Sequence, residues 1–499
     1  MNIDIENLPD DPATLKKMLS QVMSRYQYLE EQFRIAQHKQ FGKSTEGHPR
    51  QGELFNEAEE LVVEAEIAEE TISYTRKKPA RKPLPQDLPR EVIVHDISDE
   101  DKVCGCCTNE LHCIGEDKSE KLQFIPAQVK VIEHVRPKYA CRTCEKDGIS
   151  NTVKQAPVPY SVIPKGYATP SLLAQIITSK YQYGLPLYRQ ESMFKQHGVE
   201  LSRKTMADWI IRCAELFKPL YEQLHQHLRQ QPVIAADETT LKVVESEKAT
   251  SYMWLYASGA DSPTGNIPGT ETPNIVLYDY HNSRAGQCAV DFLQGYSGYL
   301  QVDGYQGYEQ TQATLIGCWA HARRKFMEAK KGAGKKGSGK ADWALNHIQK
   351  LYRIETQLKD KTVEARYIAR QEKSLPLLSQ LHTWLEKSVQ QVLPKTKLGE
   401  AIQYCLNQWK KLARYTLDGR LSIDNNRAER AIKPFVDRKN WLFSQTATGA
   451  NASAVLYSII GTAKANDLNV FEYVMTCLDE LSRPDADIEQ LLPWQFAKR

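Results

Sequence analysis

The sequence predicts a multidomain α+β protein in which regions of different chemistry follow one another along the chain. Its 499 residues are enough for about three domains with buried cores. Helical periodicity dominates residues 1–45 and much of 331–415, whereas short β-branched runs typical of strands lie within 229–330. Six of the eleven cysteines fall in residues 104–144, between the first helical region and the strand-rich region, which indicates a separate small module.

Composition narrows the class of protein. Charged residues at 25% and hydrophobic residues at 41% are ordinary values for a soluble protein. A net charge of +3 is too small to indicate nucleic-acid binding, so a DNA surface would have to be local. No apolar run reaches the length of a membrane span, and the acidic start has no signal-peptide pattern. We therefore expect a cytoplasmic protein without a membrane partner.

The first region, 1–45, is predicted to be a coiled-coil helix. Its apolar residues alternate four and three positions apart, forming one seam: Leu15, Leu19, Val22, Tyr26, Leu29, Phe33 and Ala36. This pattern favours pairing of subunits into a homo-oligomer, and the alternative is an amphipathic helix packed on its own chain. The charged segment 46–90 turns basic at 76–83, which is typical of a solvated linker or of a contact with the DNA backbone.

Paired cysteines predict a zinc ribbon-like module over 91–157. Two Cys-x-x-Cys knuckles, separated by strand-like segments such as 128–135, supply four thiolates for a structural Zn²⁺: Cys104, Cys107, Cys141 and Cys144. Cys106, His112, Cys113 and His134 are possible substitutes. We prefer Cys106 as a free thiol because a single intervening residue does not usually close a knuckle.

The region 158–228 is predicted to contain a helix-turn-helix. Helices are expected to begin near Ser171 and Leu187, and Ser202 suits the N-cap of a third. Basic residues at the start of the third helix would read DNA, with Arg203 and Lys204 as the expected contacts. The alternative is an ordinary helical hairpin.

Three acidic residues stand in places where a metal site would need them. Asp237 lies inside the strand-like run 233–241, Asp303 ends the strand-like run 299–302, and Glu429 lies at a predicted helix start. Carboxylates in such places suit hard cations such as Mg²⁺. The alternatives are that the aspartates form turns or caps, and that Asn426 and Glu429 form a capping box.

Asp303 follows Asp237 by 66 positions, enough for the antiparallel strands expected at 252–256 and 274–278. Glu429 follows Asp303 by 126 positions, more than a strand-to-helix step needs. The intervening residues show helical spacing, so we expect a helical insertion approached by a flexible basic loop at 330–340.

Four motifs resemble the signatures of the IS66 family of insertion-sequence transposases: Ala236-Asp237-Glu238-Thr239, Val302-Asp303-Gly304-Tyr305, Cys318-Trp319-Ala320-His321-Ala322-Arg323-Arg324-Lys325-Phe326 and Asp424-Asn425-Asn426-Arg427-Ala428-Glu429-Arg430. The resemblance implies an RNase H-like core of the DDE type, in which Asp237, Asp303 and Glu429 hold two Mg²⁺ or Mn²⁺ ions. It also implies accessory proteins of the same element.

This resemblance implies a DNA transposase that cuts element ends and joins them to target DNA. Arg323 and Arg324 could neutralise phosphate near the site, and their alternative is a solvated helix face. His321 could contact the substrate or a metal, although the motif alone does not make it a ligand. The zinc module and helix-turn-helix would recognise terminal repeats on double-stranded DNA, in a nucleoid-associated protein.

Two other functions remain open from sequence: a non-catalytic DNA-binding protein from a decayed element, and a structure-specific nuclease. The predicted division is coiled coil 1–45, linker 46–90, zinc module 91–157, helical DNA-binding region 158–228, catalytic core 229–330 and 416–465, helical insertion 331–415, and C-terminal helical segment 466–499.

Overall fold

The computed structural model describes residues 11–41, 92, 129–139, 154–333 and 339–498. The chain forms two compact units, residues 70–155 and residues 1–69 together with 156–499. Cys104, Cys107, Cys141 and Cys144 lie outside the described residues, as does the whole linker 46–90. The mixture of helices and sheet that the sequence predicts is confirmed.

In the smaller unit the described residues contain one short antiparallel pair, β1 (Lys138–Tyr139) with β2 (Lys154–Gln155). The strand predicted at 128–135 is wrong where the structure describes it, because 129–135 carry no regular secondary structure. Val131 and Val135 are 95% and 75% exposed. The apolar residues that suggested a strand therefore have no described layer to pack against.

Helix α1 (Pro12–Phe41) confirms the helix predicted near the N-terminus. Asp11 begins it, since its carboxylate accepts from the Thr14 backbone N–H. Several side chains of the predicted seam are open to solvent in the single chain, with Leu19, Tyr26 and Phe33 more than 60% exposed. An exposed apolar stripe of this length is what a pairing surface would need.

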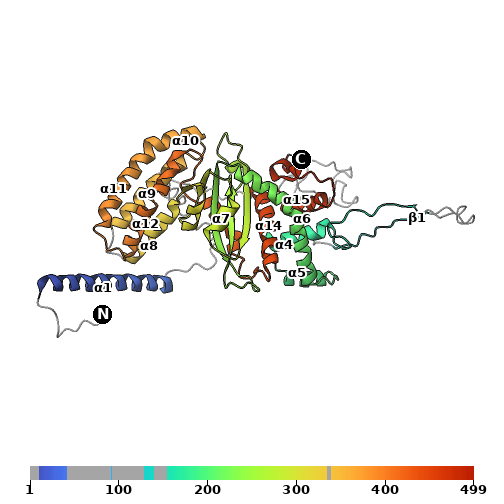
Figure 1. Ribbon diagram of the computed structural model, residues 1–499, viewed down its shortest axis with the longest axis horizontal. Helices are drawn as coiled ribbons and strands as arrows, with labels where there is room; N and C mark the ends of the chain where they lie inside the picture. Colours follow the sequence, from blue (N-terminus) through green and yellow to red (C-terminus); the bar gives the residue numbers. More distant parts are fainter. Residues whose placement is uncertain (1–10, 42–91, 93–128, 140–153, 334–338, 499) are drawn as a thin grey trace, which may run out of the picture. The chain divides into compact units, whose positions relative to one another are not determined.

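The larger unit contains a five-stranded sheet (Figure 1). Its strands lie in the order β5-β4-β3-β6-β7, so that β3 is central. The first three pair antiparallel, and β3, β6 and β7 pair parallel. The bounds are β3 (Val233–Leu241), β4 (Ser251–Ser258), β5 (Ile275–His281), β6 (Tyr299–Gln301) and β7 (Thr314–Ile316).

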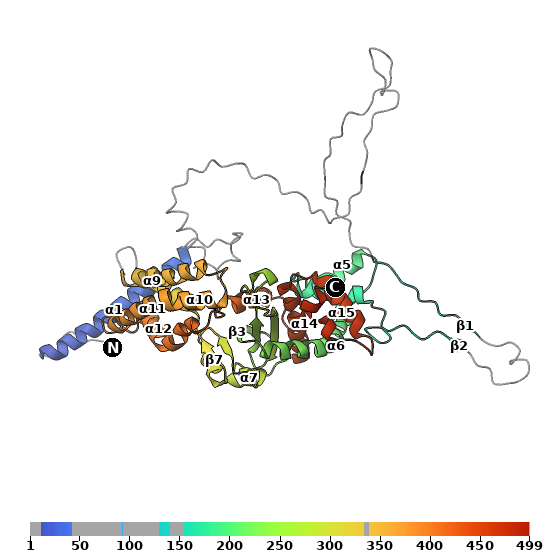
Figure 2. The ribbon, with the colours of Figure 1, turned by 90° about the horizontal axis from the view of Figure 1, so that it is seen from above.

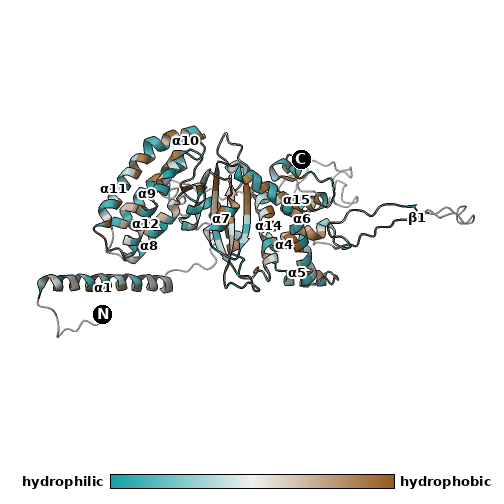
Figure 3. Ribbon diagram, in the orientation of Figure 1, coloured by the Kyte–Doolittle hydropathy of each residue, from teal (hydrophilic) through white to brown (hydrophobic). Residues whose placement is uncertain are grey.

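Helices pack against the sheet and share one hydrophobic core with it. The strands in Figure 3 mix hydrophobic and hydrophilic stretches, yet most residues of β3, β4 and β5 are wholly or partly buried, as expected for strands covered on their faces. The helices of this core are α4 (Pro170–Tyr181), α5 (Leu187–Gln196), α6 (Arg203–Arg229), α7 (Gly286–Phe292), α13 (Asn426–Val436), α14 (Ala447–Ala465), α15 (Val470–Leu481) and α16 (Pro493–Phe496). Short 3₁₀ turns are η4 (Pro263–Gly265), η5 (Gln306–Gln310) and η8 (Glu489–Leu491).

The edge strand β5 is covered by α14. Backbone N–H groups of Val276 and Tyr278 donate to the hydroxyls of Thr462 and Ser458. Side chains thus take the hydrogen-bonding positions that another strand would otherwise fill, which protects the edge.

Between β7 and α13 the chain forms the helical insertion that the sequence predicts. It has its own hydrophobic core, which α8 (Trp319–Ala333) shares through Trp319 and Phe326. The remaining elements are α9 (Gly339–Gln357), α10 (Val363–Ala369), the π-helical turn η6 (Arg370–Ser374), α11 (Leu375–Val389), α12 (Lys397–Ala413) and the 3₁₀ turn η7 (Arg414–Leu417). The basic loop expected at 330–340 is shorter than predicted, because α8 continues through 330–333 and α9 begins at Gly339.

After the insertion, α13 returns the chain to the sheet and lies beside β3 (Figure 2). Asn425, which is fully buried, donates from Nδ2 to the Ala236 carbonyl at 2.8 Å. One side chain thereby ties the start of α13 to the strand residue next to Asp237.

Candidate active site

Asp237 and Asp303 stand at equivalent positions with respect to two neighbouring parallel strands, β3 and β6. In the β3–β6 register Ala235 lies opposite Gln301, and each aspartate is two residues further along its chain. Side chains two residues apart on a strand share a face, and adjacent strands lie about 4.8 Å apart. The sheet topology therefore brings together two carboxylates that are 66 positions apart in sequence.

The electrostatics of Asp237 include the charges of three neighbouring acids. Burial raises the pKa of Asp237 well above its usual value, and the charges of Glu238, Asp303 and Glu429 raise it further. The Glu238 backbone N–H donates to Asp237 Oδ1 at 2.8 Å, which acts in the opposite direction. A bound cation would relieve the repulsion between these carboxylates.

Glu238 is an acid of the candidate site that sequence reasoning did not select. Burial raises the pKa of Glu238, while Tyr308 and Arg284 oppose that shift through hydrogen bonds. The Tyr308 hydroxyl donates to Oε2 at 2.7 Å, and Arg284 Nη2 donates to Oε1 at 2.6 Å. Its position directly after Asp237 was visible, but its partners come from distant segments.

The turn after β6 fixes Asp303. The Tyr305 backbone N–H donates to Asp303 Oδ1 at 2.9 Å, and the Tyr404 hydroxyl donates to the Asp303 carbonyl at 2.8 Å. Gly304 has φ +113°, a conformation that favours glycine, and a Cβ there would lie 3.3 Å from the Tyr404 hydroxyl. Gly304 thus lets the chain turn immediately after the carboxylate.

Glu429 lies in the first turn of α13 and is only 4% exposed. Both carboxylate oxygens are buried and neither accepts a backbone N–H, so Glu429 does not close the capping box considered from sequence. Burial raises the pKa of Glu429, Arg324 opposes this shift, and Asp303 adds to it. Asp303 and Glu429 are therefore also coupled.

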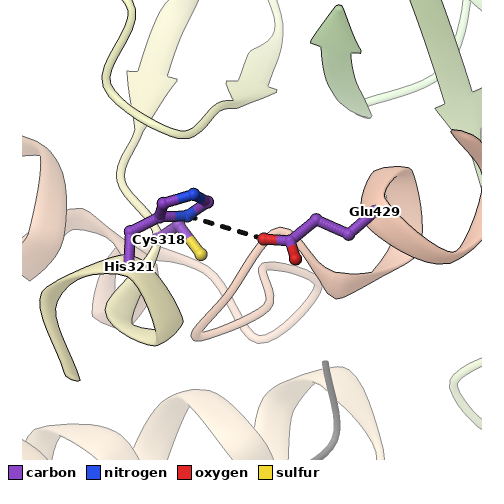
Figure 4. A group of neighbouring side chains, drawn as sticks. All are labelled: Cys318, His321 and Glu429. Carbon is purple, nitrogen blue, oxygen red and sulfur yellow. Dashed lines mark ion pairs between the residues drawn. The ribbon is translucent and has the colours of Figure 1, made fainter. Parts of the chain in front are cut away.

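Cys318 and His321 face Glu429 from the start of α8 (Figure 4). His321 Nδ1 lies 3.5 Å from Glu429 Oε1, and Arg324 Nη2 lies 3.6 Å from Oε2. Burial, with the charge of Arg324, lowers the pKa of His321 to about 4, so the imidazole is neutral at pH 7. Burial raises the pKa of the Cys318 thiol, with Asp424 and Glu429 adding to the shift.

Among the described residues, the group of three metal-ligating side chains whose ligand atoms all lie within 4.8 Å of one another is Cys318, His321 and Glu429. The three predicted acids are coupled but are not close enough to form such a group. Their oxygen donors suit hard cations, and Glu429 makes long contacts, 3.5 Å to His321 and 3.6 Å to Arg324, that a cation could replace.

The predicted basic contacts near the site differ in exposure. Arg323 is 8% exposed, whereas the side chain of Arg324 is 47% exposed, so burial favours Arg324 as a contact for DNA. Arg427 and Arg430, within two residues of Glu429 in sequence, both pair with Asp261. Those two arginines are engaged within the protein.

The predicted helix-turn-helix residues lie at the start of α6. Ser202 caps the helix, since its hydroxyl accepts from the Thr205 backbone N–H at 3.1 Å. Arg203 and Lys204 follow it on the exposed surface. The same helix continues to Arg229 and buries Leu220 in the core it shares with the sheet.

Family models match most of the chain. The model described as Transposase IS66 family matches residues 165–452, and the IS66 C-terminal element matches 458–494. The chain belongs to the IS66 family of transposases. Its family membership implies DNA as a partner.

The N-terminal half of this IS66-family chain matches two further models. The zinc-finger binding domain of transposase IS66 matches 101–145, a range that contains all four predicted zinc ligands. The model described as Transposase C of IS166 homeodomain matches 28–93. The chain therefore carries the family's zinc-binding domain.

Relatives from Sinorhizobium fredii (strain NBRC 101917 / NGR234) are similar over most of their length. Uncharacterized protein y4hP is 34% identical over 85% of this chain and 78% of the relative. Uncharacterized protein y4jD is 35% identical over 83% and 81%, and uncharacterized protein y4qI is 35% identical over 87% and 81%. In the part of this transposase-family chain that the structure describes, no helix has the length and apolar character needed to cross a membrane.

Proposed function

We propose that this IS66-family chain is a DNA transposase whose DDE triad is Asp237, Asp303 and Glu429. The observation that supports it best is the meeting of Asp237 and Asp303 across a parallel register, with Glu429 coupled to both. Three antiparallel strands followed by two parallel ones, with Asp237 on the central strand β3, support an RNase H-like core.

The three carboxylates would hold Mg²⁺ or Mn²⁺. When bound, such ions lower the pKa of an attacking water or 3′-hydroxyl and stabilise the leaving oxygen. Asp303 is oriented for this role by the Tyr305 N–H, and Glu429 is positioned by the α13 attachment at Asn425. Arg324, exposed beside Glu429, would bind a DNA phosphate.

Other parts of the chain would bind and pair the DNA ends. Cys104, Cys107, Cys141 and Cys144 would hold structural Zn²⁺ in the zinc-finger domain. That domain and the exposed Arg203 and Lys204 would recognise terminal repeats. The α1 seam would join two subunits so that two ends are handled together at the nucleoid, and accessory proteins of the element would assist.

Strand cleavage tests the proposal directly. The purified chain is incubated with a duplex containing an element end and Mg²⁺ or Mn²⁺, and nicked and joined products are separated. Asp237→Asn should abolish cleavage while DNA binding stays nearly unchanged. Asp279→Asn on β5 is the control, because this aspartate of the same sheet bonds His281 and lies outside the triad.

Equal cleavage by Asp237→Asn and the parent would reject the triad. Binding without any cleavage by the parent would favour the alternative, a non-catalytic DNA-binding protein from a decayed element. Cleavage without joined products would favour a structure-specific nuclease.

A further inference from the structure

We propose that Cys318, His321 and Glu429 form a binding site for one borderline-soft divalent ion, Zn²⁺, separate from the hard-cation positions at Asp237 and Asp303. The three ligand atoms lie within 4.8 Å of one another. His321 Nδ1 and Glu429 Oε1 are 3.5 Å apart, close to the roughly 3.3 Å that separates two ligands of a tetrahedral zinc with bonds of about 2.0–2.1 Å.

The local structure aims these atoms at one point. Cys318 directly precedes α8 and His321 lies three residues later, so both project to one side of the helix start. Glu429 reaches the same point from the first turn of α13 (Figure 4). The site is thus built from two helix starts. The Trp319 backbone N–H holds them together by donating to the Ile423 carbonyl.

Weakly paired polar atoms provide an independent sign of a ligand. His321 Nδ1 and both oxygens of Glu429 are buried, and their contacts with one another and with Arg324 are long, at 3.5 Å and 3.6 Å. Leaving a buried carboxylate without short hydrogen bonds is costly. A bound cation would satisfy these atoms together.

The donor types select the metal. Mg²⁺ takes oxygen ligands, whereas a thiolate, an imidazole and a carboxylate are the ligands that zinc accepts. Binding converts the Cys318 thiol to a thiolate and releases its proton to solvent. The Asn425 backbone N–H, 3.2 Å from Cys318 Sγ, is placed to stabilise the resulting charge.

Arg324 is the cationic competitor for this site. Its Nη2 lies 3.6 Å from Glu429 Oε2, and its Nη1 lies 3.4 Å from His321 Nε2. Coordination through Nδ1 leaves the proton on Nε2, so Arg324 has to move away when zinc binds. The arginine side chain is 47% exposed and has room to turn toward solvent.

Sharing Glu429 has a consequence that rests on the proposed function. Zinc bound at Cys318, His321 and Glu429 would withdraw Glu429 from the hard-cation positions. Zn²⁺ would therefore inhibit Mg²⁺-dependent strand cleavage by occupying this site.

Metal counting on the full-length chain tests the site without any measurement of activity. Zinc bound per chain is measured after equilibrium dialysis at a fixed free Zn²⁺ concentration. The parent should hold one more zinc than His321→Ala, and the affinity loss should exceed the about 10–100-fold caused by removing an outer-sphere partner. Arg324→Gln should bind this zinc more tightly, while His382→Ala on α11 should match the parent.

Cobalt provides the second readout. Co²⁺ added to chain whose zinc-finger domain already holds zinc should give a thiolate-to-cobalt absorption band. Cys318→Ser should remove the band, and Cys405→Ser, which changes another buried thiol on α12, should keep it. Equal zinc content in parent and His321→Ala, or a band that survives in Cys318→Ser, would overturn the site.

The inhibition experiment separates the two proposals. Added Zn²⁺ should suppress Mg²⁺-dependent cleavage by a larger factor in the parent than in His321→Ala. If the parent shows no cleavage even when no Zn²⁺ is added, the proposed function is rejected. The metal counts would still decide whether the zinc site exists.

Discussion

Asn425 should hold the triad together, and Asn425→Ala tests this. The side chain is fully buried and its Nδ2 donates to the Ala236 carbonyl at 2.8 Å, which joins α13 to β3. Removing the donor to a buried acceptor costs about 1–3 kcal/mol of unfolding free energy. No loss of an N-terminal cap adds to this, because the Asn425 side chain makes no cap hydrogen bond.

The expected result is a lower thermal midpoint for Asn425→Ala, by several degrees, measured by scanning calorimetry or fluorimetry. Strand cleavage should fall by a larger factor than stability accounts for, since α13 also carries Glu429. Asn425→Asp should be worse than alanine, because its carboxylate would face the Ala236 carbonyl. Asn451→Ala is the control, since its bond to the Ala447 carbonyl lies on the exposed face of α14 and should contribute less than about 0.5 kcal/mol. A midpoint for Asn425→Ala equal to that of the parent would show that this hydrogen bond does not hold α13 on the sheet.

Three further outcomes are expected. Arg370→Ala should lower the unfolding free energy by about 3–5 kcal/mol, because fully buried Arg370 pairs with Glu355 and donates to three backbone carbonyls. Limited proteolysis should then cut the insertion helices earlier than in the parent. Insertion helices as resistant to proteolysis as those of the parent would contradict this. Since burial raises the folded-state pKa of Glu429, the metal-free fold should lose stability as pH rises from the unfolded pKa near 4.5 through the higher folded value. Glu429→Gln should therefore be at least as heat-stable as the parent at pH 8 in chelator, and a less stable variant would argue against a penalty from the ionised acid. Cys104→Ser should release the zinc of the zinc-finger domain, whereas Cys106→Ser should retain it, as measured by metal content after dialysis; the reverse result would exchange their roles.

Local sequence patterns were sufficient to predict much of the fold. The heptad spacing predicted α1, the cap at Ser202 predicted the start of α6, and the length between Asp303 and Glu429 predicted an insertion that the structure shows to be helical. These predictions succeed because helix periodicity and capping depend on neighbouring residues alone. The strand expected at 128–135 failed since a strand also needs a partner.

The acids show the same division between local and distant information. Asp237 and Asp303 were selectable from sequence because each follows an apolar run, but their proximity depends on the β3–β6 register. Glu429 was open to a capping role until the structure placed its oxygens away from the helix N–H groups. The capping role depended only on neighbouring residues, and the tertiary structure decided against it.

By itself, the sequence determined the family, the order of its regions, the helices and the residue types available for chemistry. Only the tertiary structure decided that Arg284 and Tyr308 hold Glu238, that Asn425 joins α13 to β3, and that Cys318 and His321 face Glu429. The physical reason is that periodicity and capping act over a few residues, whereas burial, charge coupling and ligand geometry depend on distances between segments far apart in the chain.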